Sequence, residues 1–578
     1  MSIAVTGIGI ISAIGNNAEE TLASLKQQRS GIGRMKYLSS SHKDLPVGEV
    51  KLSNNEMRKM LNLEECREMS RTTMLGVIAV NQALADASLS NKTLAGKRVA
   101  LISGTTVGGM DVTERLFKEM QADDTLLEYI KHHDCGSCTN DIARLCALDC
   151  ECITISTACS SALNAIIQGC EMLKNDEVDI VVAGGTEALS KFHLNGFNTL
   201  MILDKELCRP FDDTRAGLNL GEGAAYVVLM KESAHALAYI NGYGNRCDAF
   251  HQTASSDNGE GAYLAMRDAL QMACLSPSDV DYINAHGTGT PSNDISENVA
   301  LQRVFGQSVP PVSSTKVFTG HTTSASGSIE TVISILAMRN GFIPANLGWK
   351  NPIKGGITPS LGENDVKLRN IVCNSFGFGG NDSSIVISSM PKEDPLTPAS
   401  YEVAVHSLSI LAEAEQLKDI KDFLSPMAAR RMGKMMKAAM LTSLKALKAA
   451  GIESPDAIIT ATAYGMLETS ETFLREMCEN GEETLSPTLF MQSTHNTLGS
   501  AIAIRTKCHG YNITYTQGER SLELALRDAR RLIMTGKAKN VLVGLHEEST
   551  PLFNEVCRKL GVAELPLLYS KSIVLRRK

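Results

Sequence analysis

The stretch Ile155-Ser-Thr-Ala-Cys-Ser-Ser-Ala162 places Cys159 between two different local patterns. The run before it, Ile153-Thr-Ile155, is apolar and β-prone, and the run from Ala162 to Leu173 has the spacing of a helix. We therefore expect Cys159 at a strand-to-helix junction. The helix N-terminus there favours the thiolate, so we expect a lowered cysteine pKa.

Two histidines follow in distinctive settings. They lie in Asn284-Ala-His286-Gly-Thr-Gly-Thr290 and, after Ser314-Thr-Lys316, in Gly320-His321. A thiol can carry an acyl group, and two neutral imidazoles can each present one N–H near pH 7. The three side chains indicate acyl transfer to Cys159 with a second substrate that loses carbon dioxide.

These motifs resemble those of the β-ketoacyl-acyl-carrier-protein synthases (ketosynthases) of fatty acid and type II polyketide assembly, over about residues 1–390. Further segments match that family in the same order. They are Val5-Thr-Gly-Ile-Gly9, Arg209-Pro-Phe-Asp-Asp-Thr-Arg215, Gly221-Glu-Gly-Ala224 and Asn374-Ser-Phe-Gly-Phe-Gly-Gly-Asn381. One glycine-rich loop alone would be weak support, whereas six ordered motifs are a specific signal.

Length and composition are those of an enzyme with several structural units. The chain has 578 residues, 43% of them hydrophobic, and a formal net charge of −8. At about 150 residues per domain, three to four units are expected. The negative charge argues against nucleic-acid binding. No apolar run approaches the roughly 18 residues of a membrane span, and no basic signal-peptide start is present, so we expect a cytoplasmic protein without a membrane span.

The 15 cysteines fit a reducing compartment better than a disulfide framework. Cys135-Gly-Ser-Cys138, with His132, His133, Cys146, Cys150 and Cys152 nearby, superficially suggests zinc. The second cysteine group lacks a C-x-x-C spacing, and the resembling family has no metal there. We expect buried structural thiols, with no metal and no cofactor.

Apolar β-like runs alternate with amphipathic helical patterns, which predicts α/β layers with largely parallel sheets. The resemblance implies a thiolase-like five-layer αβαβα fold with the active site between two halves. The first half, 1–240, would carry the nucleophile, and the second half, 241–390, the histidines and the lysine. The Pro-containing stretch from Pro391 to Pro398 predicts a linker at 391–400.

Residues 401–578 repeat the first half and predict a further half-thiolase-like α/β domain. The segment that starts at Ile513 aligns with the segment that starts at Ile153 at a constant offset of 360 residues (513 − 153). The same offset aligns Glu547 with Glu187. With small changes in this offset, about residues 66–187 align with residues 429–547 over the whole repeat.

Glu519 occupies the position of Cys159 in this repeat and cannot hold a thioester, and no second half follows it. The unit resembles truncated, non-catalytic ketosynthase homologues called chain length factors, which accompany ketosynthases in aryl polyene and related pigment pathways. In such pairs the first halves meet through the strand before the nucleophile. Residues 401–578 are thus expected to dock on 60–190 as an intramolecular pseudo-dimer, with further self-association left open. The alternative is a decayed duplication that only covers an apolar interface.

The resemblance implies a mechanism. Cys159 attacks an acyl-carrier-protein thioester, and the N–H groups of Cys159 and Phe378 form the oxyanion hole. Malonyl-carrier protein then loses carbon dioxide while His286 and His321 bond its thioester carbonyl, and the enolate attacks acyl-Cys159. Phe378 is also expected to gate access.

Supporting roles also follow from the resemblance. It gives Lys316 an orienting and electrostatic role with Glu330 as partner, although on sequence alone these two charges would be solvated. Asp294 and Glu297 are expected to fix the first histidine loop.

Two departures from the family pattern limit the substrate assignment. Arg215-Ala-Gly-Leu218 replaces the usual Arg-Asp-Gly-Phe, and Gly379-Gly-Asn-Asp382 replaces Gly-Gly-Thr-Asn. We expect a condensing enzyme of polyene or polyketide pigment assembly. Fatty acid elongation is the enzymatic alternative, and a non-catalytic scaffold or chain-length subunit is the alternative from another class. Thiolase chemistry is disfavoured, because thiolases use a second cysteine as base and this chain presents a second histidine.

Overall fold

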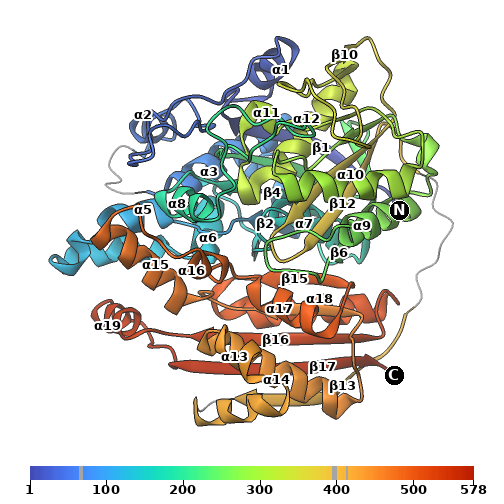
Figure 1. The fold of residues 1–578 in the computed structure, drawn as a ribbon. Helices are drawn as coiled ribbons and strands as arrows, with labels where there is room; N and C mark the ends of the chain where they lie inside the picture. The colour runs from blue at the N-terminus through green and yellow to red at the C-terminus, as the bar shows by residue number, and fades with distance from the viewer. Residues whose placement is uncertain (64–68, 393–399, 412–413) are drawn as a thin grey trace.

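Fifteen strands form one mixed sheet through the part of the chain that the computed structural model describes, residues 1–63, 69–392, 400–411 and 414–578. Most of the expected linker, 393–399, lies outside these residues, as does the expected start of the repeat near residue 66. In Figure 1 the orange-to-red C-terminal unit forms a body of its own beneath the preceding residues.

The first half contributes five strands in the order β3-β2-β4-β5-β1. Their bounds are β1 Ile3–Ser12, β2 Val99–Gly104, β3 Glu151–Ile155, β4 Ile180–Glu187 and β5 Gly223–Met230. β2 is parallel to β3 and β4, but β5 is antiparallel to both β4 and β1. The sheet is therefore mixed rather than largely parallel. The connection from β4 to β5 contains α8 (Lys191–Thr199) and a loop over 200–222.

The second half adds β6-β12-β11-β7-β8, joined through a short β1–β6 pairing. The bounds are β6 Ala238–Cys247, β7 Tyr282–Asn284, β8 Val312–Ser313, β11 Asn370–Gly377 and β12 Asn381–Ser388. Helices α7 (Ser161–Lys174) and α12 (Ser326–Asn340) are almost wholly buried between the two halves. Helices α3 (Arg71–Asp86), α9 (Glu260–Ala273) and α10 (Pro291–Phe305) lie on the outside. This layering confirms the predicted thiolase-like fold.

The C-terminal unit repeats the first half strand for strand. Its order is β15-β14-β16-β17-β13, with bounds β13 Val403–Leu411, β14 Ala457–Ala461, β15 Tyr511–Tyr515, β16 Asn540–Glu548 and β17 Leu568–Arg577. Helix α14 (Lys434–Ala450) takes the place of α3, and α18 (Ser521–Met534) takes the place of α7. β15 and α18 begin and end 360 residues after β3 and α7 (511 − 151 and 521 − 161), as the sequence repeat predicts.

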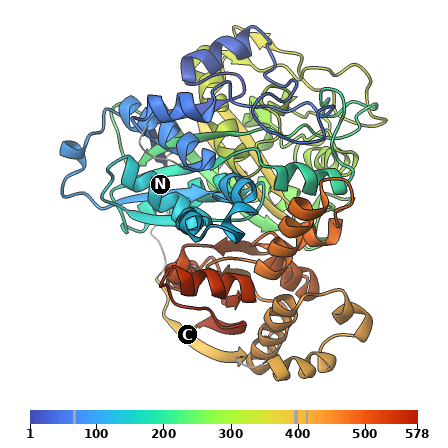
Figure 2. The same ribbon diagram turned by 90° about the vertical axis from the view of Figure 1, so that its left-hand side faces the viewer.

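The two units meet along β3 and β15, which run antiparallel and pair at Ile155 and Tyr515. Ser156 N donates to Thr514 O at 3.0 Å, and Thr516 N donates to Thr154 O at 3.0 Å. Ion pairs lie beside this strand pairing. Arg520 and Arg527 of the C-terminal unit pair with Glu151 of the first half, and Arg531 pairs with Glu177. The sheet therefore passes from one unit into the other. Figure 2 shows the orange-to-red C-terminal unit directly below the rest of the chain in the turned view as well.

The cysteine-rich segment forms ordinary structure. Cys135 begins helix α6 (Cys135–Leu145), and both Cys135 and Cys138 are buried free thiols. Across the described ranges no three His, Cys, Asp or Glu side chains gather as a metal would need. In the same ranges no helix has the length and apolarity to cross a membrane.

Candidate active site

Cys159 stands on a tight turn between β3 and α7. The residue before it, Ala158, has φ +52°, a left-handed conformation that L-residues adopt at a cost. The turn is held by Ser161, whose Oγ accepts from Thr157 N at 2.9 Å and donates to Ala158 O at 2.6 Å. The side chain of Cys159 is therefore presented at the buried junction between the two halves, where it is 5% exposed.

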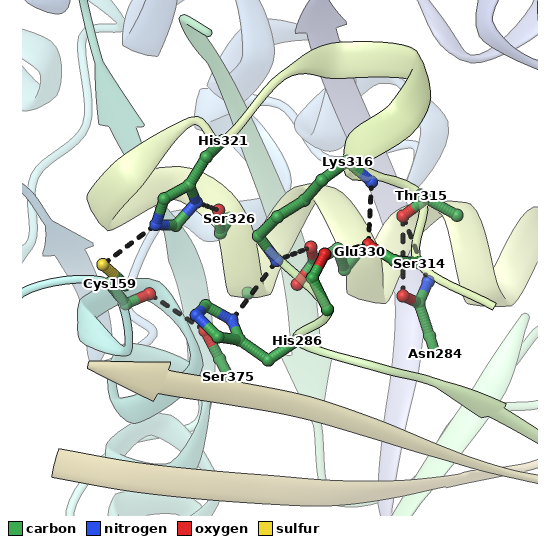
Figure 3. Close-up of polar contacts among 12 residues, drawn as sticks. Cys159, Asn284, His286, Ser314, Thr315, Lys316, His321, Ser326, Glu330 and Ser375 are labelled. Carbon is green, nitrogen blue, oxygen red and sulfur yellow. Dashed lines mark hydrogen bonds and ion pairs between the residues drawn. The ribbon is translucent and has the colours of Figure 1, made fainter. Parts of the chain in front are cut away.

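His321 reaches this thiol from the second half. Its Nε2 lies 3.0 Å from Cys159 Sγ, and its Nδ1 lies 3.0 Å from Ser326 Oγ (Figure 3). Gly320, with φ +72°, makes the turn between α11 (Lys316–Thr319) and His321, and a Cβ there would lie 2.7 Å from Leu220 O. Because a serine hydroxyl can donate or accept, both neutral tautomers of His321 fit this site.

Lys316 connects the second histidine to a buried carboxylate. Lys316 Nζ lies 3.2 Å from His286 Nδ1 and 2.5 Å from Glu330 Oε1 (Figure 3). An ammonium group can only donate, so His286 Nδ1 accepts and its Nε2 carries the proton. His286 thus presents an N–H on the side of its ring away from Lys316. Its ring centroid is 5.4 Å from that of His321.

Burial sets the charge state of these groups. It lowers the pKa of both His286 and His321 well below the ordinary value, and the Lys316 ammonium lowers them further. Burial also raises the pKa of Glu330 to about 7, against the opposite effect of Lys316. Both imidazoles are therefore neutral at pH 7, in agreement with the expected pair of neutral donors.

The expected lowering of the Cys159 pKa is wrong in direction. Burial raises the pKa of this thiol to about 11, although Lys316 and the backbone N–H groups of Phe378 and Cys159 act to lower it. The helix end is present, but desolvation of the thiolate outweighs it. The thiol is therefore protonated at pH 7, and His321 Nε2 is in hydrogen-bonding range to accept its proton.

The glycine-rich loop brings Phe378 to the thiol. It links β11 to β12, and the backbone N–H groups of Phe378 and Cys159 both act to lower the pKa of the thiol. Ser375 Oγ donates to Cys159 O at 2.9 Å and ties the loop strand to the nucleophile turn. The Phe378 ring stacks on Phe197 with centroids 5.6 Å apart. The glycine-rich loop thus adjoins the turn of Cys159 through Ser375, and its Phe378 ring packs on α8.

Two of the predicted supporting carboxylates, Asp294 and Glu297, accept hydrogen bonds from backbone N–H groups of nearby loops. Glu297 accepts from the N–H groups of His286 and Gly287 at 2.8 and 2.7 Å. Asp294 accepts from the N–H groups of Phe211 and Gly289 at 2.8 and 3.2 Å. Neither contacts Cys159 in the described residues, so both hold the loops that carry the histidine.

Glu519 does not belong to this cluster. It lies in a short turn between β15 and α18, where Gly518 has φ +55° and matches Ala158, and its side chain is exposed. It borders a cavity of about 810 Å³ between the first half and the C-terminal unit. That cavity is lined by apolar side chains from both units, including Val107, Met110, Phe117, Leu474, Phe490 and Leu552.

Sequence patterns did not point to several residues at the site. Ser326 and Ser375 lie inside or next to the quoted motifs, so their spacing to His321 and Phe378 could have suggested them. Phe197 carries no such signal, because its place beside Phe378 depends on the packing of α8 (Lys191–Thr199). Asn496 of the C-terminal unit, which bonds the carbonyl of Phe378, was also missed.

Family profiles match three consecutive parts of the chain. "Beta-ketoacyl synthase, N-terminal domain" matches residues 1–235, and "Beta-ketoacyl synthase, C-terminal domain" matches residues 237–350. A second profile that is also described as "Beta-ketoacyl synthase, N-terminal domain" matches residues 407–565. The C-terminal unit is therefore related to the first half in sequence as well as in fold.

Characterised relatives match over nearly their full length. The 3-oxoacyl-[acyl-carrier-protein] synthase 2 of Coxiella burnetii is 31% identical over 409 residues, which cover 67% of this chain and 98% of that protein. The synthase of the same name from Vibrio cholerae is 29% identical over 411 residues, 67% of this chain and 99% of that protein.

Solved structures give the same picture. "The ishigamide ketosynthase/chain length factor" is 27% identical with a TM-score of 0.62, over 67% of this chain and 99% of that one. "PfaC Keto synthase-Chain length factor" has a TM-score of 0.80 over 100% of this chain and 78% of that one; at 17% identity it shows the fold alone. Together with the near-complete match to the Coxiella synthase, these likenesses show that the chain belongs to the beta-ketoacyl synthase family.

Proposed function

We propose that the protein joins an acyl group on Cys159 to malonyl-acyl carrier protein by decarboxylative Claisen condensation, giving a β-ketoacyl-carrier protein. The observation that carries this proposal is the cluster in Figure 3. One buried thiol lies 3.0 Å from a neutral histidine, and a second neutral histidine is oriented by Lys316.

Acylation comes first. Cys159 Sγ attacks the thioester carbonyl of the acyl-carrier protein, and its proton passes to His321 Nε2. The oxyanion accepts hydrogen bonds from the N–H groups of Cys159 and Phe378. When the intermediate collapses, the carrier thiolate leaves and takes the proton from His321. The acyl group remains as a thioester on Cys159.

Condensation follows when malonyl-carrier protein binds. Its C–C bond to the carboxylate breaks, carbon dioxide leaves, and the electron pair forms an enolate of the carrier thioester. N–H groups of His286 and His321 stabilise the enolate oxygen, because both rings are neutral and can donate without adding charge. The enolate carbon attacks acyl-Cys159, and the Cys159 thiolate that leaves takes a proton from solvent. The chain is two carbons longer.

The C-terminal unit acts in this proposal as a fused chain-length-factor-like partner. More than half of the residues that line the 810 Å³ cavity come from this unit, and Phe192 and His193 of the first half line it as well. Phe197 packs edge-on against the rings of both His193 and His321. The growing chain would extend into this space, so the unit limits product length. The likeness to the ishigamide ketosynthase/chain length factor supports this pairing of roles, and the resemblance of the sequence motifs favours polyene or polyketide assembly.

The first test is mass spectrometry of carrier-bound products made from acyl- and malonyl-carrier protein by the native protein and by Cys159→Ala. The proposal requires a β-ketoacyl product two carbons longer that disappears in the variant. If product persists in Cys159→Ala, or if no starter is extended, the scaffold alternative becomes the better explanation.

A second test addresses product length. Leu552→Trp adds bulk to the cavity wall, whereas Met427→Trp, at an exposed position outside the cavity lining, serves as the matched control. Products of several extensions should become shorter only in Leu552→Trp. An unchanged length distribution would contradict the role of the cavity and favour a unit that only covers the interface.

A further inference from the structure

The loop that carries Phe378 is held from one side by the C-terminal unit. Asn496 precedes helix α17 (Thr497–Thr506) and donates from Nδ2 to the Phe378 carbonyl oxygen at 2.8 Å. The same Nδ2 donates to Asn381 Oδ1 at 2.6 Å, and Asn496 is 1% exposed. The amide orientation follows from these two acceptors, because only the NH₂ end can serve both.

Asn381 is engaged by the C-terminal unit at both ends of its amide. Its Oδ1 accepts from Asn496, and its Nδ2 donates to Asn512 O at 3.0 Å. The ketosynthase pattern has threonine at this place. A threonine side chain is shorter and has a single hydroxyl for both contacts, whereas asparagine has a separate acceptor and donor. The departure from the family pattern at 381 therefore matches the presence of the fused unit.

Close packing fixes the rest of the loop. Gly379 has φ +83°, and a Cβ there would lie 2.0 Å from Ser500 Oγ of α17. On the opposite side Gly379 N donates to Gln252 O at 2.7 Å, and Gly380 N donates to Gly377 O at 3.0 Å. The loop is thus clamped between the second half and the C-terminal unit. Gly377, the residue before Phe378, adjoins the turn of Cys159, because a Cβ there would lie 3.3 Å from Cys159 N.

We propose that Asn496 is a positioning residue for the oxyanion hole. Its bond to the Phe378 carbonyl and to Asn381 holds the Phe378 N–H in the direction of the tetrahedral oxyanion. An oxyanion donor is effective only when it is fixed before charge develops. A residue of the C-terminal unit thereby fixes a donor that belongs to the other unit. This inference rests on the proposed function, since the oxyanion forms only if Cys159 accepts an acyl group.

The test separates acyl transfer from simple alkylation in the full-length protein. Asn496→Ala should lower the rate of acyl transfer from acyl-carrier protein to Cys159, followed by intact-protein mass spectrometry, about 10- to 100-fold. Alkylation of Cys159 by iodoacetamide has no tetrahedral intermediate and should change less than about twofold. A parallel fall in both rates would mean that the nucleophile itself was disturbed and would overturn the proposal.

Gln517→Ala is the matched control. Gln517 is also buried at the interface and bonds across it to Thr154 and Asn140 at 2.6 and 2.9 Å, but it does not contact the Phe378 loop. Both rates should stay within about twofold of native in this variant. An equal loss of acyl transfer in Gln517→Ala and Asn496→Ala would show a general interface effect and overturn the assignment to Asn496.

Asn496→Asp adds a pH signature. An ionised aspartate cannot donate to Phe378 O or Asn381 Oδ1, while a protonated one regains a single O–H donor. Acyl transfer in this variant, relative to native protein at each pH, should therefore recover as pH falls, whereas Asn496→Ala should show a constant ratio. A constant ratio in Asn496→Asp would overturn the hydrogen-bond explanation. If the native protein is not acylated by any carrier substrate, the proposed function fails instead, and alkylation rates remain to show that Cys159 is intact.

Discussion

The first half and the C-terminal unit share one strand order but differ in what surrounds them. β1 of the first half pairs with β5 on one side and β6 on the other, and α12 covers its inner face. β13, the corresponding strand of the C-terminal unit, is the last strand of the sheet within the described residues. Its side chains Val405, Leu408 and Ile410 are exposed. The same strand is therefore core in one unit and edge in the other.

The two nucleophile turns differ in the same way. Ala158 and Gly518 have nearly equal φ angles of +52° and +55°, and Ser161 and Ser521 make equivalent bonds to the turn. Yet Cys159 is buried and bonds His321 of the second half, whereas Glu519 is exposed. In the proposed mechanism a turn of the right shape is not sufficient, because His286, His321 and Lys316 come from residues 241–390.

The largest effect should come from moving the thiol between the two turns. Cys159→Ala should lower condensation by about 10³-fold or more, since the covalent intermediate is lost. The double variant Cys159→Ala/Glu519→Cys should remain as inactive, because His321 bonds the thiol at residue 159 and neither His286 nor His321 lines the cavity that Glu519 borders. Radiolabelled malonyl-carrier consumption and product mass measure both. Recovery of activity in the double variant would contradict the need for the second half.

The contrast between core strand and edge strand predicts a large difference in stability. Ile10 is 0% exposed in β1, and Ile410, at the corresponding place in β13, is 48% exposed. Ile10→Ala should lower the free energy of unfolding by about 2–5 kcal/mol, because it leaves a cavity in the core. Ile410→Ala should change it by no more than about 0.5 kcal/mol. Urea unfolding followed by circular dichroism checks both. A comparable loss in Ile410→Ala would show that β13 is covered in solution.

Local motifs made the candidate site residues predictable from the sequence. Contacts and burial that depend on long-range packing could not be predicted in the same way. Cys159, His286 and His321 lie in segments whose neighbours define them, and the repeat at offset 360 (513 − 153) was visible in the sequence. The contact between Asn496 and Phe378 spans 118 residues and follows no motif. The pKa of Cys159 was predicted in the wrong direction, because the sequence reveals the helix end but not the burial that outweighs it.

An intermediate effect is expected at Lys316, which has no counterpart in the C-terminal unit. Lys316→Met removes the donor that orients His286 and should lower condensation about 100-fold. It also leaves Glu330 without its partner. The pKa of Glu330 is already raised to about 7 and would rise further, so this carboxyl would become neutral instead of remaining a buried charge.

The double variant Lys316→Met/Glu330→Gln separates the two consequences. It should recover any stability lost by Lys316→Met, as measured by thermal unfolding, but not the condensation rate. Recovery of the rate would mean that Lys316 only balances the charge of Glu330. No recovery of stability would mean that Glu330 remains ionised in the single variant.

The smallest expected effect is a pH dependence that distinguishes burial from the helix end at Cys159. With a pKa of about 11, the thiolate fraction should rise about tenfold per pH unit between pH 7 and 10. The folded state favours the protonated thiol. The associated stability is therefore present below the ordinary cysteine pKa and is lost as pH rises through about 11.

Iodoacetamide alkylation of Cys159, located by peptide mass spectrometry, measures the profile, with a free cysteine peptide of ordinary pKa as control. Because Lys316 lowers this pKa, Lys316→Met should shift the profile to still higher pH. A rate that is already constant from pH 7 would show that the helix N-terminus prevails over desolvation. The nucleophile turn would then make the thiolate by itself, and His321 would not be needed to take the proton.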